Sequence, residues 1–316
     1  MPDSRYRRHL PQLDDRLFLT DGGCETSLIF HDGIDLPLFA SFTLLKDDEG
    51  TEALRRYYRP YAQLAAENGT GFVLETPTWR ASPRWAKELD VSDEELDHLN
   101  RKAIGLMEEL REEFEADAPF VISGNIGPQD DGYSPETILS ADEAEEYHST
   151  QITTFADTAA DLVTALTMTY ADEAIGIARA AKNAGIPAVI GFTVETDGRL
   201  PDGQALGDAI GAVESATDRY PAYYMINCAH PTHFESVLHG DDWVERVRGL
   251  RANASMRSHA ELDEAEDLDD GDPQDLAARY GALRDKLPAL NVVGGCCGTD
   301  HRHVGEICSV FTSLRS

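Results

Sequence analysis

Three cysteines are the side chains in this sequence best suited to bind a metal ion. Cys296 and Cys297 are adjacent and follow Gly294 and Gly295, and Cys228 follows the apolar run 223–227. Zn²⁺ binds cysteine thiolates readily, and a zinc with three protein ligands keeps one coordination position open for a substrate. The sequence therefore predicts a zinc site formed by Cys228, Cys296 and Cys297 with one open side.

This ligand set favours chemistry on a thiol over hydrolysis. Three thiolates outweigh the charge of Zn²⁺, so such a zinc activates water weakly but still lowers the pKa of a bound thiol. The predicted reaction is capture of a substrate thiol as its thiolate, followed by attack of that sulfur on an electrophilic carbon.

Two other interpretations of the cysteines remain open. Cys296 and Cys297 could form a vicinal disulfide, or His230 or His301 could complete a closed zinc site. Either arrangement would make a non-catalytic redox or structural protein that binds no thiol. The isolated Cys24 and Cys308 are interpreted as small buried apolar side chains.

The elements that must position these residues alternate along the chain. Short apolar runs are typical of buried parallel strands, and longer amphipathic stretches are typical of helices. Eight such pairs in 316 residues predict an α/β fold, a (β/α)8 barrel that forms a single domain over residues 1–316, with an open doubly wound sheet as the alternative. The expected strands are Leu17–Thr20, Phe72–Glu75, Phe120–Ser123, Leu162–Leu166, Ala188–Thr193, Tyr223–Asn227, Val247–Arg251 and Asn291–Gly294. The expected helices are 52–68, 93–115, 142–157, 172–184, 205–217, 233–239, 275–286 and 301–313.

Local signals mark several helix ends. Ser92 with Glu95, and Ser140 with Glu143, have the spacing of capping boxes, and Gly69 and Gly185 are suited to end helices. The acidic stretch Glu261–Asp275 predicts a solvated loop after the seventh strand, with a functional lid as the alternative.

A barrel would bring distant residues together. Active sites of these barrels lie at the carboxyl ends of the strands. Polar or unusual residues follow six of the expected strands: Asp21-Gly22-Gly23, Glu75, Gly124–Pro128, Asn227-Cys228, Asn253 and Cys296-Cys297. We therefore expect Cys228 to meet the cysteine pair at one mouth. Gly294 and Gly295 would permit the close approach and unusual dihedral angles that let both adjacent cysteines reach one metal.

The composition limits the partners. The net charge is −31, which opposes binding to nucleic acid or to an anionic membrane. Only five basic residues are lysine, and an acidic, lysine-poor surface is typical of a halophilic protein. With no apolar signal segment or membrane span in the sequence, we expect a cytoplasmic protein. The sequence is also compatible with a homo-oligomer.

The motifs resemble those of one family over almost the whole chain, the zinc-dependent homocysteine S-methyltransferases. This family includes betaine–homocysteine and S-methylmethionine–homocysteine methyltransferases and the homocysteine domain of cobalamin-dependent methionine synthase. The motifs that carry the resemblance are Asp21–Thr26, Glu75–Ser82, Ser123–Pro128, Asn227-Cys228 with Pro231, and Gly294–Gly298. The resemblance implies a (β/α)8 barrel with zinc on Cys228, Cys296 and Cys297.

It also implies transfer of a methyl group from a small molecule to the thiol of homocysteine, giving methionine. In the family, the aspartate of the first motif helps to hold the amino acid substrate, and the resemblance gives this role to Asp21, with Gly22 and Gly23 nearby. We assign Glu75 and Asn227 to the same substrate site. Because no folate or cobalamin domain fits in 316 residues, a self-contained donor such as S-methylmethionine or a betaine is preferred.

The fourth strand departs from the family pattern. Leu166 stands where the family usually has a glutamate that binds the amino group of the substrate. Losing that partner would weaken amino-acid binding unless another carboxylate replaces it. Either Glu75 or Glu195 compensates, or the acceptor is a different small thiol.

Overall fold

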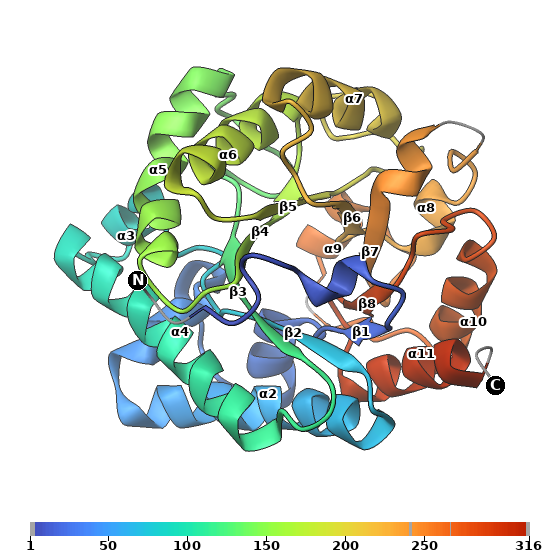
Figure 1. Cartoon of the computed structure of the whole chain (residues 1–316), viewed down its shortest axis with the longest axis horizontal. Helices are drawn as coiled ribbons and strands as arrows, with labels where there is room; N and C mark the ends of the chain where they lie inside the picture. The colour runs from blue at the N-terminus through green and yellow to red at the C-terminus, as the bar shows by residue number, and fades with distance from the viewer. Residues whose placement is uncertain (1–3, 240–241, 266, 314–316) are drawn as a thin grey trace.

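The chain forms a closed barrel of eight parallel strands in sequential order (Figure 1). The computed structural model describes residues 4–239, 242–265 and 267–313. The prediction of a (β/α)8 barrel is confirmed, and the doubly wound alternative is wrong, because β1 pairs with both β2 and β8. The strands are β1 Phe18–Leu19, β2 Gly71–Glu75, β3 Phe120–Ile126, β4 Leu162–Met168, β5 Ala188–Phe192, β6 Tyr224–Asn227, β7 Val247–Ala252 and β8 Val292–Gly295.

Helices cover the outside of the barrel (Figure 1). Most predicted helices are present, but the one expected over 233–239 is wrong: only the four-residue α8 forms there, starting at Pro231. A helix this short has too few turns for a reliable apolar period, and α3 and α9 were missed for the same reason. The α-helices are α1 Cys24–Thr26, α2 Asp48–Asn68, α3 Pro83–Glu88, α4 Asp93–Phe114, α5 Ala141–Ala156, α6 Ala171–Ala184, α7 Leu206–Thr217, α8 Pro231–Phe234, α9 His259–Asp263, α10 Pro273–Leu283 and α11 His301–Ser313.

The predicted capping residues lie at the helix ends, and only one predicted capping box is incomplete. Ser140 and Glu143 form a complete capping box at the start of α5. At α4, the Ser92 side chain accepts from the backbone N–H of Glu95, and only this half of the predicted box is present. Gly69 and Gly185 end α2 and α6 with φ of 62° and 70°, the left-handed conformation that glycine adopts without strain.

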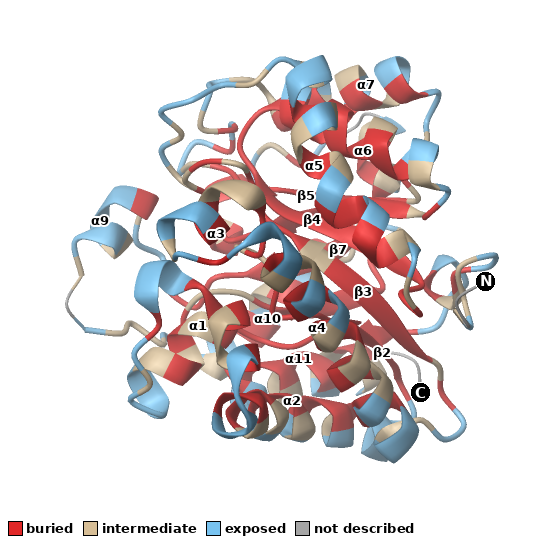
Figure 2. Ribbon diagram, turned by 90° about the vertical axis from the view of Figure 1, so that its left-hand side faces the viewer, coloured by how far each residue is buried: buried red, intermediate tan, exposed pale blue. Residues whose placement is uncertain are grey.

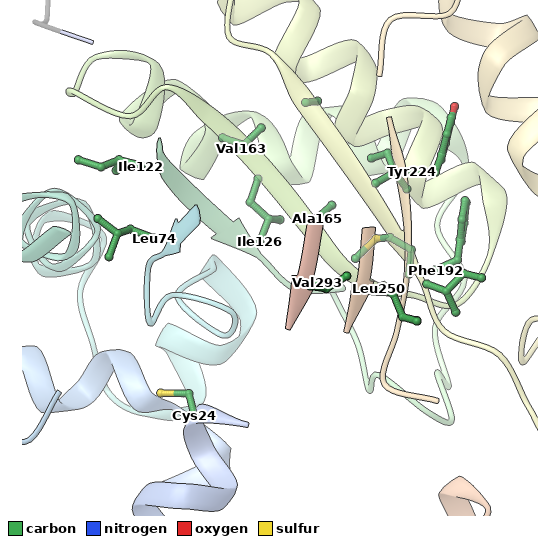
Figure 3. Packing of buried hydrophobic residues seen from close by; sticks show 14 of the residues in the cluster. Cys24, Leu74, Ile122, Ile126, Val163, Ala165, Phe192, Tyr224, Leu250 and Val293 are labelled. Carbon is green, nitrogen blue, oxygen red and sulfur yellow. The ribbon is translucent and has the colours of Figure 1, made fainter. Parts of the chain in front are cut away.

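Apolar side chains pack on both faces of the strands, and the strands are buried except at Asn125 and Arg248, which are partly exposed (Figure 2). Outward-facing residues such as Leu74, Ile122 and Val163 belong to the large cluster between barrel and helices (Figure 3). The barrel interior is filled by a smaller cluster. It consists of Leu10, Phe18, Val73, Val121, Leu162, Leu166, Val189, Tyr223, Met225 and Val292. Because apolar side chains fill the interior, polar residues gather at the mouth.

Two further predictions can be compared with the fold. Cys24 and Cys308 are buried in the large apolar cluster, as expected. The acidic stretch after β7 is not a plain loop: α9 begins at the buried His259 and ends at Asp263, and α10 starts at Pro273. Among the described residues, no helix is both long and apolar enough to cross a membrane.

Candidate active site

The three cysteines meet at the carboxyl ends of β6 and β8. Their sulfur atoms all lie within 4.8 Å of one another, and Sγ of Cys228 is 3.6 Å from Sγ of Cys297. Cys228 is buried, while Cys296 and Cys297 are partly exposed at the mouth. The convergence expected from strand topology is therefore present, although 68 residues separate Cys228 from Cys296.

Backbone geometry explains how consecutive cysteines reach one point. Cys228 has φ of 56°, an uncommon left-handed conformation for a non-glycine residue, and it turns the chain at the end of β6. A Cβ atom on Gly294 would collide with Thr20, and one on Gly295 would collide with Thr299. Glycine is thus required at both positions so that the backbone of β8 can approach Thr20 and Thr299 closely. The unusual dihedral angle expected in this segment occurs at Gly298, which has a positive φ.

The thiols share negative charge unequally. Hydrogen bonds from the other two thiols, with the nearby Arg251 guanidinium, hold the pKa of Cys296 well below its usual value. Hydrogen bonding to Cys296, together with burial, raises the pKa of Cys228 well above its usual value. The pKa of Cys297 is raised as well, so without a metal the negative charge is confined to Cys296. A bound cation would favour ionisation of all three thiols, because it offsets the repulsion between neighbouring thiolates.

Tyr133 packs against the cysteine cluster. Its hydroxyl lies 3.0 Å from Sγ of Cys228 and 3.6 Å from Sγ of Cys297. The ring stacks on His259 from α9, with centroids 4.0 Å apart and an angle of 10° between the planes. His259 in turn contacts the Cys228 carbonyl oxygen at 2.8 Å and the Glu195 carboxylate at 3.1 Å. The segment after β7 therefore helps hold Tyr133 in place.

The histidines proposed for a closed metal site lie elsewhere. His230 caps α8 and bonds through Nδ1 to Thr232. His301 is exposed on α11, with its ring 6.5 Å from that of Tyr61. In the described part of the chain, the only metal-competent group at this mouth consists of Cys228, Cys296 and Cys297, and all three cysteines are free thiols.

A cavity of about 170 Å³ opens beside the cysteines and receives the predicted substrate residues. Asp21, Gly22, Gly23, Glu75 and Asn227 all line it. Other lining residues are Glu25, Trp79, Arg80, Asn125, Asp131, Tyr133, Leu166, Arg251 and Asp263. Asn253, which follows β7, is buried but is not among the lining residues.

Asp21 is tied to a buried arginine. Nη2 of Arg251 lies 2.9 Å from Oδ1 of Asp21, and the Tyr57 hydroxyl donates to Oδ2 at 2.8 Å. Arg251 also donates from Nη2 to the Gly22 carbonyl oxygen and from Nε to that of Gly295. Burial raises the pKa of Asp21, and Arg251 and Tyr57 oppose that rise. The ion pair joins the ends of β1, β7 and β8 directly beneath the cysteines.

Comparison with known proteins agrees with this geometry. A family model described as homocysteine S-methyltransferase matches residues 18–311. The chain belongs to the homocysteine S-methyltransferase family. This assignment confirms the resemblance recognised in the motifs, and it makes the protein an S-methyltransferase enzyme.

Solved structures show the same fold. The oxidized form of the homocysteine methyltransferase MmuM from Escherichia coli is 19% identical, covers 99% of this chain and 100% of that one, and has a TM-score of 0.74. The metallated form of MmuM is 20% identical, with coverages of 96% and 98% and a TM-score of 0.71. A comparison with curated protein sequences gave no match.

In this S-methyltransferase, the end of β4 is irregular. The pairing of β4 with β5 shifts register between Ala165 and Met168, and Thr167 has φ of 65°. The Asn227 amide holds this distortion, because Oδ1 accepts from Thr167 N at 2.9 Å and Nδ2 donates to Thr167 Oγ1 at 2.8 Å. Leu166, in the place of the family glutamate, presents an apolar side chain to the cavity.

Sequence reasoning missed several residues of the methyltransferase site. Arg251 could have been found, because it is a charged residue at the carboxyl end of an expected strand, the rule that identified Glu75. Tyr133 and His259 carry no motif that the sequence analysis used, and they reach the cysteines only through the fold. Glu195, the other candidate to replace the carboxylate at position 166, is not among the residues that line the cavity, and its side chain pairs with His259.

Proposed function

We propose that this enzyme holds Zn²⁺ on Cys228, Cys296 and Cys297 and transfers a methyl group from a small donor to the thiol of homocysteine, giving methionine. The observation that carries the proposal is the convergence of three thiols at the barrel mouth, with their open side toward a cavity. The family assignment supports the methyl transfer, and the donor set supports the metal.

The cysteine geometry suits zinc. A tetrahedral zinc with sulfur ligands at about 2.3 Å places those sulfurs about 3.8 Å apart. The observed separation of 3.6 Å between Cys228 and Cys297 is near that value. When bound there, Zn²⁺ would lower the pKa of an acceptor thiol so that it reacts as a thiolate.

The outer cavity suits a cationic methyl donor. The carboxylates of Glu25, Asp131 and Asp263 line it, and Arg80 lies 3.7 Å from Asp131. The aromatic ring of Trp79 also lines the cavity, and such faces attract cations. A sulfonium such as S-methylmethionine or a betaine-like ammonium matches this charge. Holding donor and thiolate in line would supply much of the rate acceleration.

Leu166 is also compatible with a second acceptor, a small thiol without an amino group. It lines the cavity and offers no charge to an ammonium group, so the same chemistry on another small thiol would need no change in the cysteine site. This alternative differs from the main proposal only in the acceptor, and a comparison of thiols with and without an amino group separates the two.

The test combines metal analysis with methyl-transfer assays in high potassium chloride. We expect about one zinc per purified chain, loss of zinc and activity in Cys297→Ser, and retention of both in Cys308→Ala, where the thiol is on the buried face of α11 in the apolar cluster. Methyl transfer that survives loss of Cys296 and Cys297 together would overturn the proposal. Activity confined to amino-free thiols would reject homocysteine as the acceptor.

A further inference from the structure

Among the described residues, two buried charged side chains in the cavity each leave one atom with neither a hydrogen bond nor an ion pair, whereas Oδ1 of Asp21 has at least the ion pair with Arg251. Glu75 at the end of β2 is 3% exposed, and Arg251 on β7 is 4% exposed. The atoms are Oε2 of Glu75 and Nη1 of Arg251. A buried polar atom without a partner destabilises the free protein, so a molecule that satisfied both atoms would bind favourably there.

Arg251 is fixed by its other bonds. Nε and Nη2 donate to the carbonyl oxygens of Gly295 and Gly22, and Nη2 also pairs with Asp21. Asp21 is therefore already neutralised within the protein. Nη1 is the remaining guanidinium nitrogen, on a residue that lines the cavity, and a guanidinium nitrogen binds a carboxylate by a charge-assisted hydrogen bond.

Glu75 has a different set of neighbours. The charged groups that face it are Arg251 from β7 and Asp21 from the end of β1, and the hydroxyls of Ser123 on β3 and Thr164 on β4 lie close enough to its carboxyl group to lower its pKa. Leu166 on β4 lines the same cavity and adds only apolar surface. Glu75 thus supplies a carboxylate on the second strand, where the fourth strand has lost one.

We propose that Glu75 and Arg251 recognise the acceptor amino acid: its ammonium group binds Oε2 of Glu75 and its carboxylate binds Nη1 of Arg251. The inference rests on the proposed function for the position of the acceptor sulfur at the cysteines. Opposite charges on two strands match the two charges of an amino acid, and the apolar Leu166 suits its methylene chain. Glu75 thereby takes over amino-group recognition from position 166.

The binding test uses thioethers, so that it does not depend on thiol capture or methyl transfer. Methionine is titrated by calorimetry into the full-length protein as purified, in high potassium chloride. It is compared with 4-(methylthio)butanoate, which lacks the amino group, and 3-(methylthio)propylamine, which lacks the carboxylate. We expect each analogue to bind at least roughly tenfold more weakly than methionine, because each leaves one buried charge unpaired.

Matched variants test which residue causes the preference for methionine over 4-(methylthio)butanoate. Glu75→Gln should bind methionine and 4-(methylthio)butanoate about equally. Glu25→Gln changes another carboxylate of the same cavity, whose Oε1 already accepts from the Ser41 hydroxyl, and should keep the preference for methionine. Loss of the preference in Glu25→Gln and its retention in Glu75→Gln would overturn the proposal.

A second measurement needs no variant. Burial raises the pKa of Glu75 to about 7, so the carboxyl group is mostly protonated below that pH in the free protein. Methionine should therefore bind roughly tenfold more tightly at pH 8 than at pH 6, while 4-(methylthio)butanoate should not gain. Equal pH dependence for the two thioethers would contradict recognition by Glu75. Because no methyl group is transferred in this experiment, failure here would reject Glu75 and Arg251 as the recognition residues and would leave the proposed methyl transfer at the cysteines untouched.

Discussion

The hydroxyl of Tyr133 lies 3.0 Å from the sulfur of Cys228, beside the cavity that both residues line. These residues are 95 positions apart, and the contact depends on the stacking of Tyr133 against His259. Tyr133 therefore covers part of the cysteine cluster, and Cys228 in particular.

The first prediction concerns this cover. In metal-free protein, Tyr133→Ala should increase the rate at which an alkylating reagent modifies the cysteine cluster several-fold, because the ring no longer shields the thiols. Tyr133→Phe keeps the stacked ring and should change the rate little. Mass spectrometry of alkylated peptides gives the rates, and equal rates in the two variants would show that the ring is not the barrier.

A second prediction concerns the distorted end of β4. Asn227→Ala removes two hydrogen bonds that hold Thr167 at positive φ, and we expect it to lower the free energy of unfolding by about 2–3 kcal/mol. Adding Thr167→Gly should recover about 1 kcal/mol, because glycine adopts that φ without strain. Urea unfolding measures both changes. Asn183→Ala, at an exposed position, is the control, and a cost as large as that of Asn227→Ala would contradict the assignment.

The third prediction compares two glycines. Gly294→Ala should destabilise the protein, because the new Cβ would collide with Thr20 and Asp21 at the end of β8. Gly211 lies within α7, where an added Cβ atom would meet open space, and Gly211→Ala should stabilise by about 0.5–1 kcal/mol. Thermal unfolding of the two variants should therefore shift in opposite directions. If Gly294→Ala left the unfolding temperature unchanged, the ends of β1 and β8 would have to separate more easily than their packing indicates.

The fourth prediction concerns stability and pH. The pKa of Glu75 is raised from 4.5 to about 7 in the folded protein, mainly by burial. The folded state then holds this proton more tightly than the unfolded chain. Its contribution to stability is complete below pH 4.5 and is lost as pH rises through 7, a loss of up to about 3 kcal/mol.

The Glu75→Gln variant has no group that titrates at this position. Relative to the wild type, its free energy of unfolding should therefore rise between pH 5 and pH 8. Denaturant unfolding at several pH values, at constant salt, gives the difference. A difference between the two proteins that does not vary with pH would contradict a protonated, buried Glu75.

Much of the fold was predictable because it depends on local pattern. Buried parallel strands require apolar runs, and the helices that cover them require an amphipathic period, so the order of elements followed from the sequence. The same rule placed Cys228, Cys296 and Cys297 at one mouth, since parallel strands of a barrel end on the same side. Short elements such as α8 and α9 escaped prediction because so few residues carry little periodicity.

The sequence by itself determined the barrel, the cysteine cluster and the absence of a carboxylate at position 166. Only the tertiary structure showed that Arg251 pairs with Asp21, that Tyr133 covers Cys228, and that Glu75 faces the cavity with one oxygen unpaired. The physical reason is that residue types and strand order are encoded locally. Which polar atoms remain unsatisfied depends on every side chain that packs around them, and those side chains come from several strands and loops.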